Sequence, residues 1–285
     1  MKKVFILALT AFMILPVSCN KTQDEKQNQL DPPATKELAQ TIRFNTPVEI
    51  GALSINSIEL TEASRYIIEY NQTKADWGAS ILYGTYSFAN NIFSLQGFGN
   101  LQLSGNIVTI SPSAAGSGPV EVVANINPTT TTTETSSNAC RNWEIGQIIL
   151  GLSGGEFGQA GIEKIFKNGI DMKEIGEWAS EYFPISQEDL ATIAPYSVKE
   201  ICMAGSGSFV LAFKSADPFY GSYTLSGSNF SYTLSEDDIP FISGGKVSGS
   251  IEFTGTTCKI EATATAVYEQ EKYDATLEME LHEIR

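Results

Sequence analysis

The chain has 285 residues, of which 33 are acidic and 18 basic, so it carries a formal net charge of −15 at pH 7. A surface this acidic repels nucleic acid and anionic lipid headgroups, which argues against either as a binding partner. A hydrophobic content of 42% with 10% aromatic residues is typical of a folded chain, which argues against general disorder.

The first residues have the pattern of a secretory signal peptide. Lys2 and Lys3 form a basic start, and residues 4–15 are a continuous apolar run. This run is shorter than the roughly 20 residues that a bilayer crossing needs. A signal peptide is therefore predicted over residues 1–18, directly before Cys19.

A small residue immediately before a cysteine, straight after an apolar run, resembles the lipobox of bacterial lipoproteins. The segment departs from the family pattern at Pro16, where Leu is usual, and Leu15 lies one place early. The resemblance implies that Cys19 is the lipidation site and carries palmitate-type acyl chains. The protein would then be anchored to the outer membrane, on its periplasmic or cell-surface face. Ordinary signal cleavage nearby, with Cys19 a chance residue, is the alternative.

Composition divides the rest of the chain into a tether and two domains. Residues 19–38 are rich in polar residues and proline and cannot bury enough apolar surface to fold. A Thr-rich run at 128–138 predicts a linker between a first β domain at 39–127 and a second at 139–285. Within the second domain a helical insertion is expected at about 159–194.

Short segments with strand composition follow one another in the first domain. Tyr66, Ile68 and Tyr70 alternate with the other face of their segment, as in a half-buried strand. Asn90-Asn91 between two such segments predicts a hairpin turn with positive φ. The expected strands lie at 54–60, 65–70, 83–88, 92–95, 101–103, 107–110 and 120–126.

The second domain interrupts this pattern with helical spacing. Apolar residues at three- and four-residue intervals predict short helices at 162–166 and 172–179, parted by Asn168-Gly169. Ser186, followed by acidic residues, predicts the N-cap of a third helix. Strand patterning then returns at 198–203, 209–213, 220–225, 229–234, 246–253, 258–267 and 273–282.

The two halves contain a weak internal repeat. Tyr83 to Phe88 lines up with Tyr220 to Leu225, and Glu59-Leu60 lines up with Glu200-Ile201. We interpret this as one β module used twice, with helices inserted between the first strands of the second copy. Convergent hairpin chemistry is the alternative.

The hairpins, together with a Trp-bearing first strand at Asn142-Trp143-Glu144, resemble the lipocalin-like lipoproteins of Bacteroidota. The resemblance spans most of 140–285 outside the helices and, more faintly, 41–126. It implies a mostly β fold, α+β by its helical insertion, made of two antiparallel meander modules that form barrels or half-barrels. Such a shape can hold a small apolar ligand. The resemblance brings no catalytic residues with it.

Three cysteines remain besides Cys19. Cys140, Cys202 and Cys258 are an odd number for an oxidising compartment, so one disulfide and one buried thiol are expected. Three pairings are open, and Cys202 with Cys258 is favoured because both fall in expected strands. No metal or cofactor is predicted, since the cysteines lack C-x-x-C spacing and the chain has one histidine.

Candidate catalytic groups are few. His282, on the polar face of the last expected strand, is best interpreted as a solvated histidine, which leaves no base for a nucleophile triad. The Glu236-Asp237-Asp238 cluster is most simply a solvated turn, and Glu278 and Glu280 are most simply the solvent side of a sheet. Paired carboxylates of a hydrolase stay open as a third hypothesis.

Aromatic residues are the one positive indication of ligand binding. Trp77, Tyr83, Tyr86 and Phe88 crowd the middle of the first domain. Exposed, they would suit sugars or apolar ligands; facing inward, they would be the core of a small β domain.

The sequence therefore predicts a non-enzymatic cell-envelope lipoprotein that binds a small ligand, or a protein or glycan partner, through a lipocalin-like β module. The alternative is a structural or adhesive surface lipoprotein without a ligand cavity.

Overall fold

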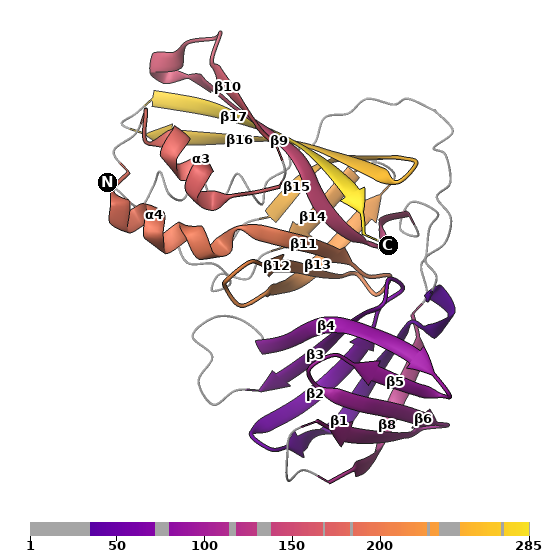
Figure 1. Cartoon of the computed structure of the whole chain (residues 1–285). Coiled ribbons are helices and arrows are strands. Elements are labelled where there is room, and N and C mark those ends of the chain that lie inside the picture. Colours follow the sequence, from indigo (N-terminus) through magenta and orange to yellow (C-terminus); the bar gives the residue numbers. More distant parts are fainter. Residues whose placement is uncertain are drawn as a thin grey trace. The chain divides into compact units, whose positions relative to one another are not determined.

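The computed structural model describes most of the chain as two compact units (Figure 1). One unit comprises residues 32–141 with 204–206, and the other mainly residues 142–203 and 207–285. The described residues are 35–71, 80–113, 118–129, 138–167, 169–182, 185–226, 229–233, 246–268 and 271–284.

The first unit is a closed barrel of antiparallel strands in sequence order. The last strand pairs with the first, Ile126 opposite Ile42, and this pairing closes the barrel. A 3-10 helix, η1 (Lys36–Leu38), precedes the barrel strands, which are β1 (Gln40–Ile50), β2 (Leu53–Leu60), β3 (Arg65–Asn71), β4 (Ser80–Ala89), β5 (Ile92–Leu95), β6 (Gly99–Ser104), β7 (Ile107–Pro112) and β8 (Val120–Pro128).

The predicted hairpin in the middle of this barrel is confirmed. Asn90 and Asn91 join β4 to β5 with φ of 51° and 62°, the left-handed conformation that asparagine tolerates better than most residues. Phe88 faces Phe93 across the hairpin. The turn therefore fixes the register of these two strands locally.

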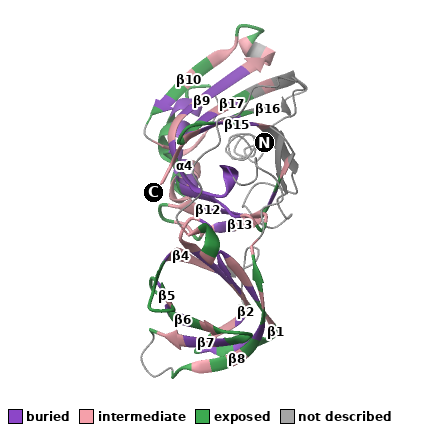
Figure 2. Ribbon diagram, turned by 90° about the vertical axis from the view of Figure 1, so that its right-hand side faces the viewer, coloured by how far each residue is buried: buried purple, intermediate pink, exposed green. Residues whose placement is uncertain are grey.

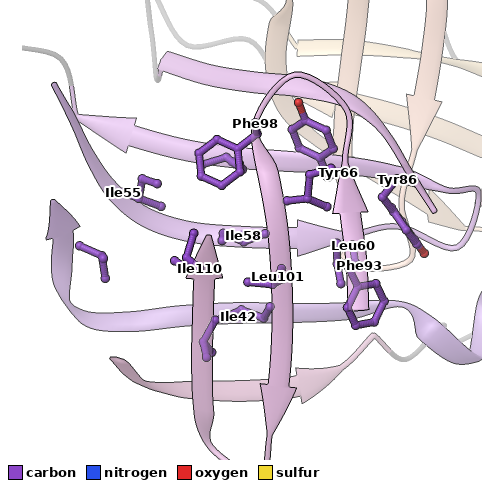
Figure 3. Packing of buried hydrophobic residues seen from close by; sticks show 14 of the residues in the cluster. Ile42, Ile55, Ile58, Leu60, Tyr66, Tyr86, Phe93, Phe98, Leu101 and Ile110 are labelled. Atoms are coloured by element: carbon purple, nitrogen blue, oxygen red, sulfur yellow. The ribbon is translucent and has the colours of Figure 1, made fainter. Parts of the chain in front are cut away.

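Side chains fill the interior of the first barrel (Figure 3). Ile58, Ile68 and Leu101 are among those with no exposed surface. The interior of an eight-stranded barrel is narrow enough for its own side chains to fill it, although some such barrels hold one small ligand instead. The buried residues of this single core are Ile42, Val48, Ile50, Ile55, Ile58, Leu60, Tyr66, Ile68, Tyr86, Phe93, Leu95, Phe98, Leu101, Val108, Ile110 and Ala124.

The second unit is also built on a ring of antiparallel pairings. One edge of β9 pairs with β17, and the other edge pairs first with β11 and then with β10. Without β10, the other eight strands of this nine-stranded sheet therefore form a closed ring. The strands are β9 (Asn142–Gly154), β10 (Ile162–Lys167), β11 (Val198–Met203), β12 (Ser208–Phe213), β13 (Phe219–Ser226), β14 (Asn229–Thr233), β15 (Lys246–Thr254), β16 (Thr257–Tyr268) and β17 (Glu271–Glu283).

Two of the three predicted helices are confirmed. Asp171 caps α3 (Met172–Ala179) by accepting the backbone N–H groups of Lys173 and Glu174. Ser186 and Asp189 form a capping box at the start of α4 (Gln187–Ile193). Two 3-10 turns complete the insertion, η2 (Gly155–Phe157) and η3 (Ala194–Tyr196).

The helix predicted at 162–166 is wrong, because this segment is strand β10. It pairs with β9 along its whole length, from Ile162 opposite Leu152 to Lys167 opposite Gln147. Short apolar runs fit both periods, and here a long neighbouring strand supplies the backbone partners. The insertion between the first strands of the module thus contains a strand as well as helices.

The predicted fold class is confirmed: two antiparallel β-meander modules, the second with a helical insertion. The repeated hairpin segments occupy equivalent strands, β4 and β13. Their registers also agree, since Tyr66 faces Gly84 in the first module and Phe209 faces Gly221 in the second.

One part of the repeat alignment needs correction. Leu60 pairs with Tyr66, and Met203 pairs with the equivalent Phe209. The register therefore matches Glu59-Leu60 with Cys202-Met203, two residues beyond the predicted Glu200-Ile201. Glu200-Ile201 has a Glu before an apolar residue, as Glu59-Leu60 has, so sequence similarity alone favoured the wrong segment.

Candidate functional site

The proposed ligand-facing aromatics are divided between different environments. Tyr86 is buried in the core, where its hydroxyl donates to the Thr61 carbonyl at 2.9 Å. Phe88 is 38% exposed at the end of β4, with its ring centroid 4.4 Å from that of Phe93. Tyr83 is half-buried, and its position in β4 places it on the opposite face from Tyr86.

These placements separate the aromatic residues that the sequence groups together. Trp77, the fourth of them, lies outside the described residues. Tyr86 packs edge-on against Phe93, with centroids 5.8 Å apart, as part of the hydrophobic core. Phe88 is the one described member of the group with a substantially exposed ring.

His282 lies at the solvent-facing side of the second unit. Its Nε2 atom lies 3.3 Å from Glu280, and both side chains are substantially exposed. The imidazole also lies against Gly146, next to the register shift between β9 and β17. The structure gives His282 a carboxylate neighbour, as in a surface ion pair when the imidazole is protonated.

The two glutamates of the last strand belong to the same outer face, as predicted. Lys259 lies 3.1 Å from Glu278 and 2.9 Å from Glu261. The hydrogen bond to Glu261 and the nearby charges raise the pKa of Lys259. The pair with Glu278 joins β16 to β17 and the pair with Glu261 lies within β16; both are on an exposed sheet surface, where each contributes little to stability.

Two buried carboxylates in the first unit were not singled out by sequence reasoning. Both oxygens of Glu62 accept the backbone N–H of Gly205 at 3.1 Å. Ser206 donates its hydroxyl to Glu59 at 2.5 Å. Residues 204–206 belong to the same compact unit as both acids.

Electrostatics distinguish Glu62 from an ordinary surface glutamate. Burial raises its pKa, the negative charge of Glu59 raises it further, and the backbone hydrogen bonds, including that from Gly205, oppose the shift. Buried acids of this kind are often functional, but they also occur in structural networks. Here hydrogen bonds from Gly205 and Ser206 engage both carboxylates.

No sequence signal marks Glu59 and Glu62 as buried. Glu59 occupies the polar half of an alternating strand, and Glu62 follows in the connection to β3. Their burial depends on what packs over them, which local sequence does not encode.

The predicted disulfide between Cys202 and Cys258 is absent from the structure. Both residues are buried, as is Cys140, and no disulfide joins any two of the three. Ile201 pairs with Trp143, whose ring lies 5.9 Å from that of Phe253, and Phe253 pairs with Cys258.

That chain of contacts explains the missing bond. Directly opposite residues of paired strands share a face, and the rings of Trp143 and Phe253 meet on one face. Ile201 and Cys258 therefore face that same side of the sheet. Cys202, the residue after Ile201, faces the other side. Side chains on opposite faces cannot meet the short Cβ–Cβ distance that a disulfide requires. Burial also raises the pKa of Cys258 well above its usual value, which favours the unreactive thiol.

Other predicted features fall outside the described residues: Cys19, the Glu236-Asp237-Asp238 cluster and most of the Thr-rich linker. Among the residues that are described, no group of three or more His, Cys, Asp or Glu side chains is arranged to hold a metal ion. Nor does this part of the chain contain a helix long and apolar enough to cross a membrane.

Comparison with known proteins gives no family assignment. No protein-family model matches the chain, and no curated protein is significantly similar to it.

Solved structures similar to the chain include two mutants of transferrin binding protein B (TbpB), a vaccine antigen from Haemophilus parasuis Hp5. The double mutant shares 10% identity over 87% of this chain and 45% of its own, with a TM-score of 0.26. A single mutant shares 8% over 81% and 54%, with a TM-score of 0.27. This chain thus spans about half the length of those proteins.

Proposed function

We propose that the chain is a non-enzymatic cell-envelope lipoprotein that binds a macromolecular partner on the outside of its β modules. The observation that carries this proposal is the filled interior of the first barrel. Sixteen buried residues form one core there, so the inward side chains pack against each other. Binding by this module is therefore expected on its outer strand faces and loops.

The non-enzymatic part of the proposal is supported by how the chemically capable groups are engaged. His282, the one histidine of the chain, contacts Glu280 on an exposed sheet face. Glu59 and Glu62 are hydrogen-bonded to residues 204–206. A carboxylate hydrolase needs two acids facing each other across an open groove, roughly 5–9 Å apart.

The lipoprotein part is supported by the sequence around Cys19. The basic start, the apolar run and the cysteine follow in the order that lipoprotein export requires. Several acyl chains, each adding about 0.8 kcal/mol per buried methylene, would hold the protein at a membrane. Attachment to the outer membrane, on either face, belongs to this proposal.

Metabolic labelling tests the anchor. Cells that make the full chain are fed an alkyne analogue of palmitate, and the protein is then probed for the label. The wild-type chain is expected to be labelled and Cys19→Ala unlabelled. Label that persists in the variant would place the lipid elsewhere.

Native mass spectrometry of the full chain, extracted from its own envelope in mild detergent, tests the binding mode. A macromolecular partner at a fixed ratio is the expected result. A small molecule that is present in the native sample and absent after denaturation would instead identify a ligand carrier.

A further inference from the structure

Strand β10 exposes one backbone edge of the second unit. Its pairing with β9 is its one strand pairing in the described part of the chain (Figure 1). Unpaired backbone N–H and C=O groups along a sheet edge are a template for another strand. The edge is six residues long, from Ile162 to Lys167.

The two faces of β10 differ. Phe166 is buried against Trp178 of α3, with ring centroids 5.7 Å apart, and Lys164 lies over the same Phe166 ring at 5.1 Å. The opposite face carries Glu163, Ile165 and Lys167, all exposed (Figure 2). Ile165 is 48% exposed, one of the few large apolar side chains so placed.

From this edge we infer that a second copy of the chain pairs with β10, in antiparallel register, about a two-fold axis through Ile165. Such an isologous contact presents the same surface from both copies. In that register Ile165 faces Ile165 of the other copy, and Glu163 faces Lys167 in both directions. Two opposite-charge pairs thus flank one apolar pair on the outer face.

The neighbouring two-fold registers lack these opposite-charge pairs. Directly opposite residues of an antiparallel pair share a face, so the axis must pass through a residue position. An axis at Lys164 would oppose two lysines, and an axis at Glu163 two glutamates, both repulsive. An axis at Phe166 would set Ile165 against Lys167 and leave no charge pair.

The inner face also fits the register centred on Ile165. There Lys164 faces Phe166 of the other copy, so the ammonium group stands beside a second aromatic ring. This repeats the cation–π contact that Lys164 already makes within its own strand. Lysines on an edge strand ordinarily oppose pairing; here both have a matching group opposite them.

An edge of six residues buries much less area than the roughly 1,600 Å² of a standard interface, so the two copies should associate weakly. Disulfide trapping in the full chain tests this contact, because it captures a weak dimer covalently. Ile165→Cys is expected to give a covalent dimer under mild oxidation, since residues at the axis lie about 5 Å apart. Glu163→Cys is the matched control. In the proposed register the two cysteines at position 163 are offset by four residues along the strands. They lie about 14 Å apart, too far for a disulfide.

Charge variants test the register. In the Ile165→Cys background, Lys167→Glu should lower the cross-linked fraction roughly tenfold, because two attractive pairs become repulsive. Adding Glu163→Lys restores opposite charges and should restore the dimer. Circular dichroism of each variant establishes that it is folded.

A folded Ile165→Cys variant that stays monomeric would overturn the inference, as would equal cross-linking of Glu163→Cys. If Lys167→Glu leaves the cross-linked fraction of Ile165→Cys unchanged, the proposed register is wrong. The wild-type chain measures background from its native cysteines, three of which are buried. The inference does not depend on a lipid anchor or on another partner, so the proposed function and this contact can fail separately.

Discussion

The ring of Tyr66 lies directly against Gly84, its cross-strand partner in β4. A β-carbon at position 84 would lie 2.9 Å from both Cε1 and the hydroxyl oxygen of Tyr66. Because nothing projects from Gly84, the ring can lie across it, and its hydroxyl donates to the Gln96 carbonyl at 2.7 Å. The glycine of the repeated hairpin segment thus has a packing role in the first module.

Replacing Gly84 with alanine should destabilise the first barrel. The added methyl group overlaps the Tyr66 ring, which is held by its hydrogen bond, and overpacking of this kind costs about 1–3 kcal/mol. Gly118→Ala is the control, since nothing lies within 4 Å of a β-carbon there. Denaturant unfolding followed by fluorescence measures both. Equal stability of the two variants would show that Tyr66 moves aside freely.

Glu62→Gln should change how stability depends on pH. Burial raises the pKa of Glu62 above 4.5, so between pH 4.5 and that raised pKa the native state binds more protons than the unfolded state. The free energy of unfolding therefore falls as pH rises through this window. Glutamine does not titrate, so the stability of the wild type relative to Glu62→Gln should decrease from pH 4.5 to neutral pH.

Chemical denaturation at several pH values in this range measures that difference. Glu121→Gln, at an exposed position of β8, is the control. The difference in unfolding free energy between this variant and the wild type should stay constant across the pH range. A constant difference between the wild type and Glu62→Gln would contradict the raised pKa.

Ser186→Ala should loosen α4. The hydroxyl of Ser186 accepts the backbone N–H of Asp189 at 3.2 Å, and loss of an N-cap costs about 1 kcal/mol. Hydrogen exchange of residues 187–193 should accelerate, while exchange in β9 should not. Ser186→Thr keeps a hydroxyl and should retain most of the protection; similar exchange in both variants would argue against the cap.

Cys140, Cys202 and Cys258 should all be thiols. Denaturation without reductant, followed by alkylation, should label all three of Cys140, Cys202 and Cys258. Reduction before alkylation should not increase the number of labels on these three residues. In the native protein these positions should label slowly because all three are buried. Two labels that appear after reduction alone would reveal a disulfide that the structure lacks.

Local sequence determined the elements whose causes are local. The Asn90-Asn91 turn, the Ser186 cap and the 172–179 helix depend on backbone preferences and on hydrogen bonds within a few residues. Alternating apolar residues marked most strands, because successive side chains of a strand face opposite sides. The repeat in the two halves pointed to two equivalent modules, since β4 and β13 carry the same hairpin pattern.

Tertiary structure alone decided the features that depend on a distant partner. Residues 162–167 became a strand because β9 offers them a backbone to pair with. Cys202 and Cys258 were separated by the face on which each strand register places them. Glu62 is buried, and its carboxylate accepts the backbone N–H of Gly205, more than a hundred positions away. Composition and periodicity describe the chain near a residue, whereas pairing, register and burial are set by what the fold brings against it.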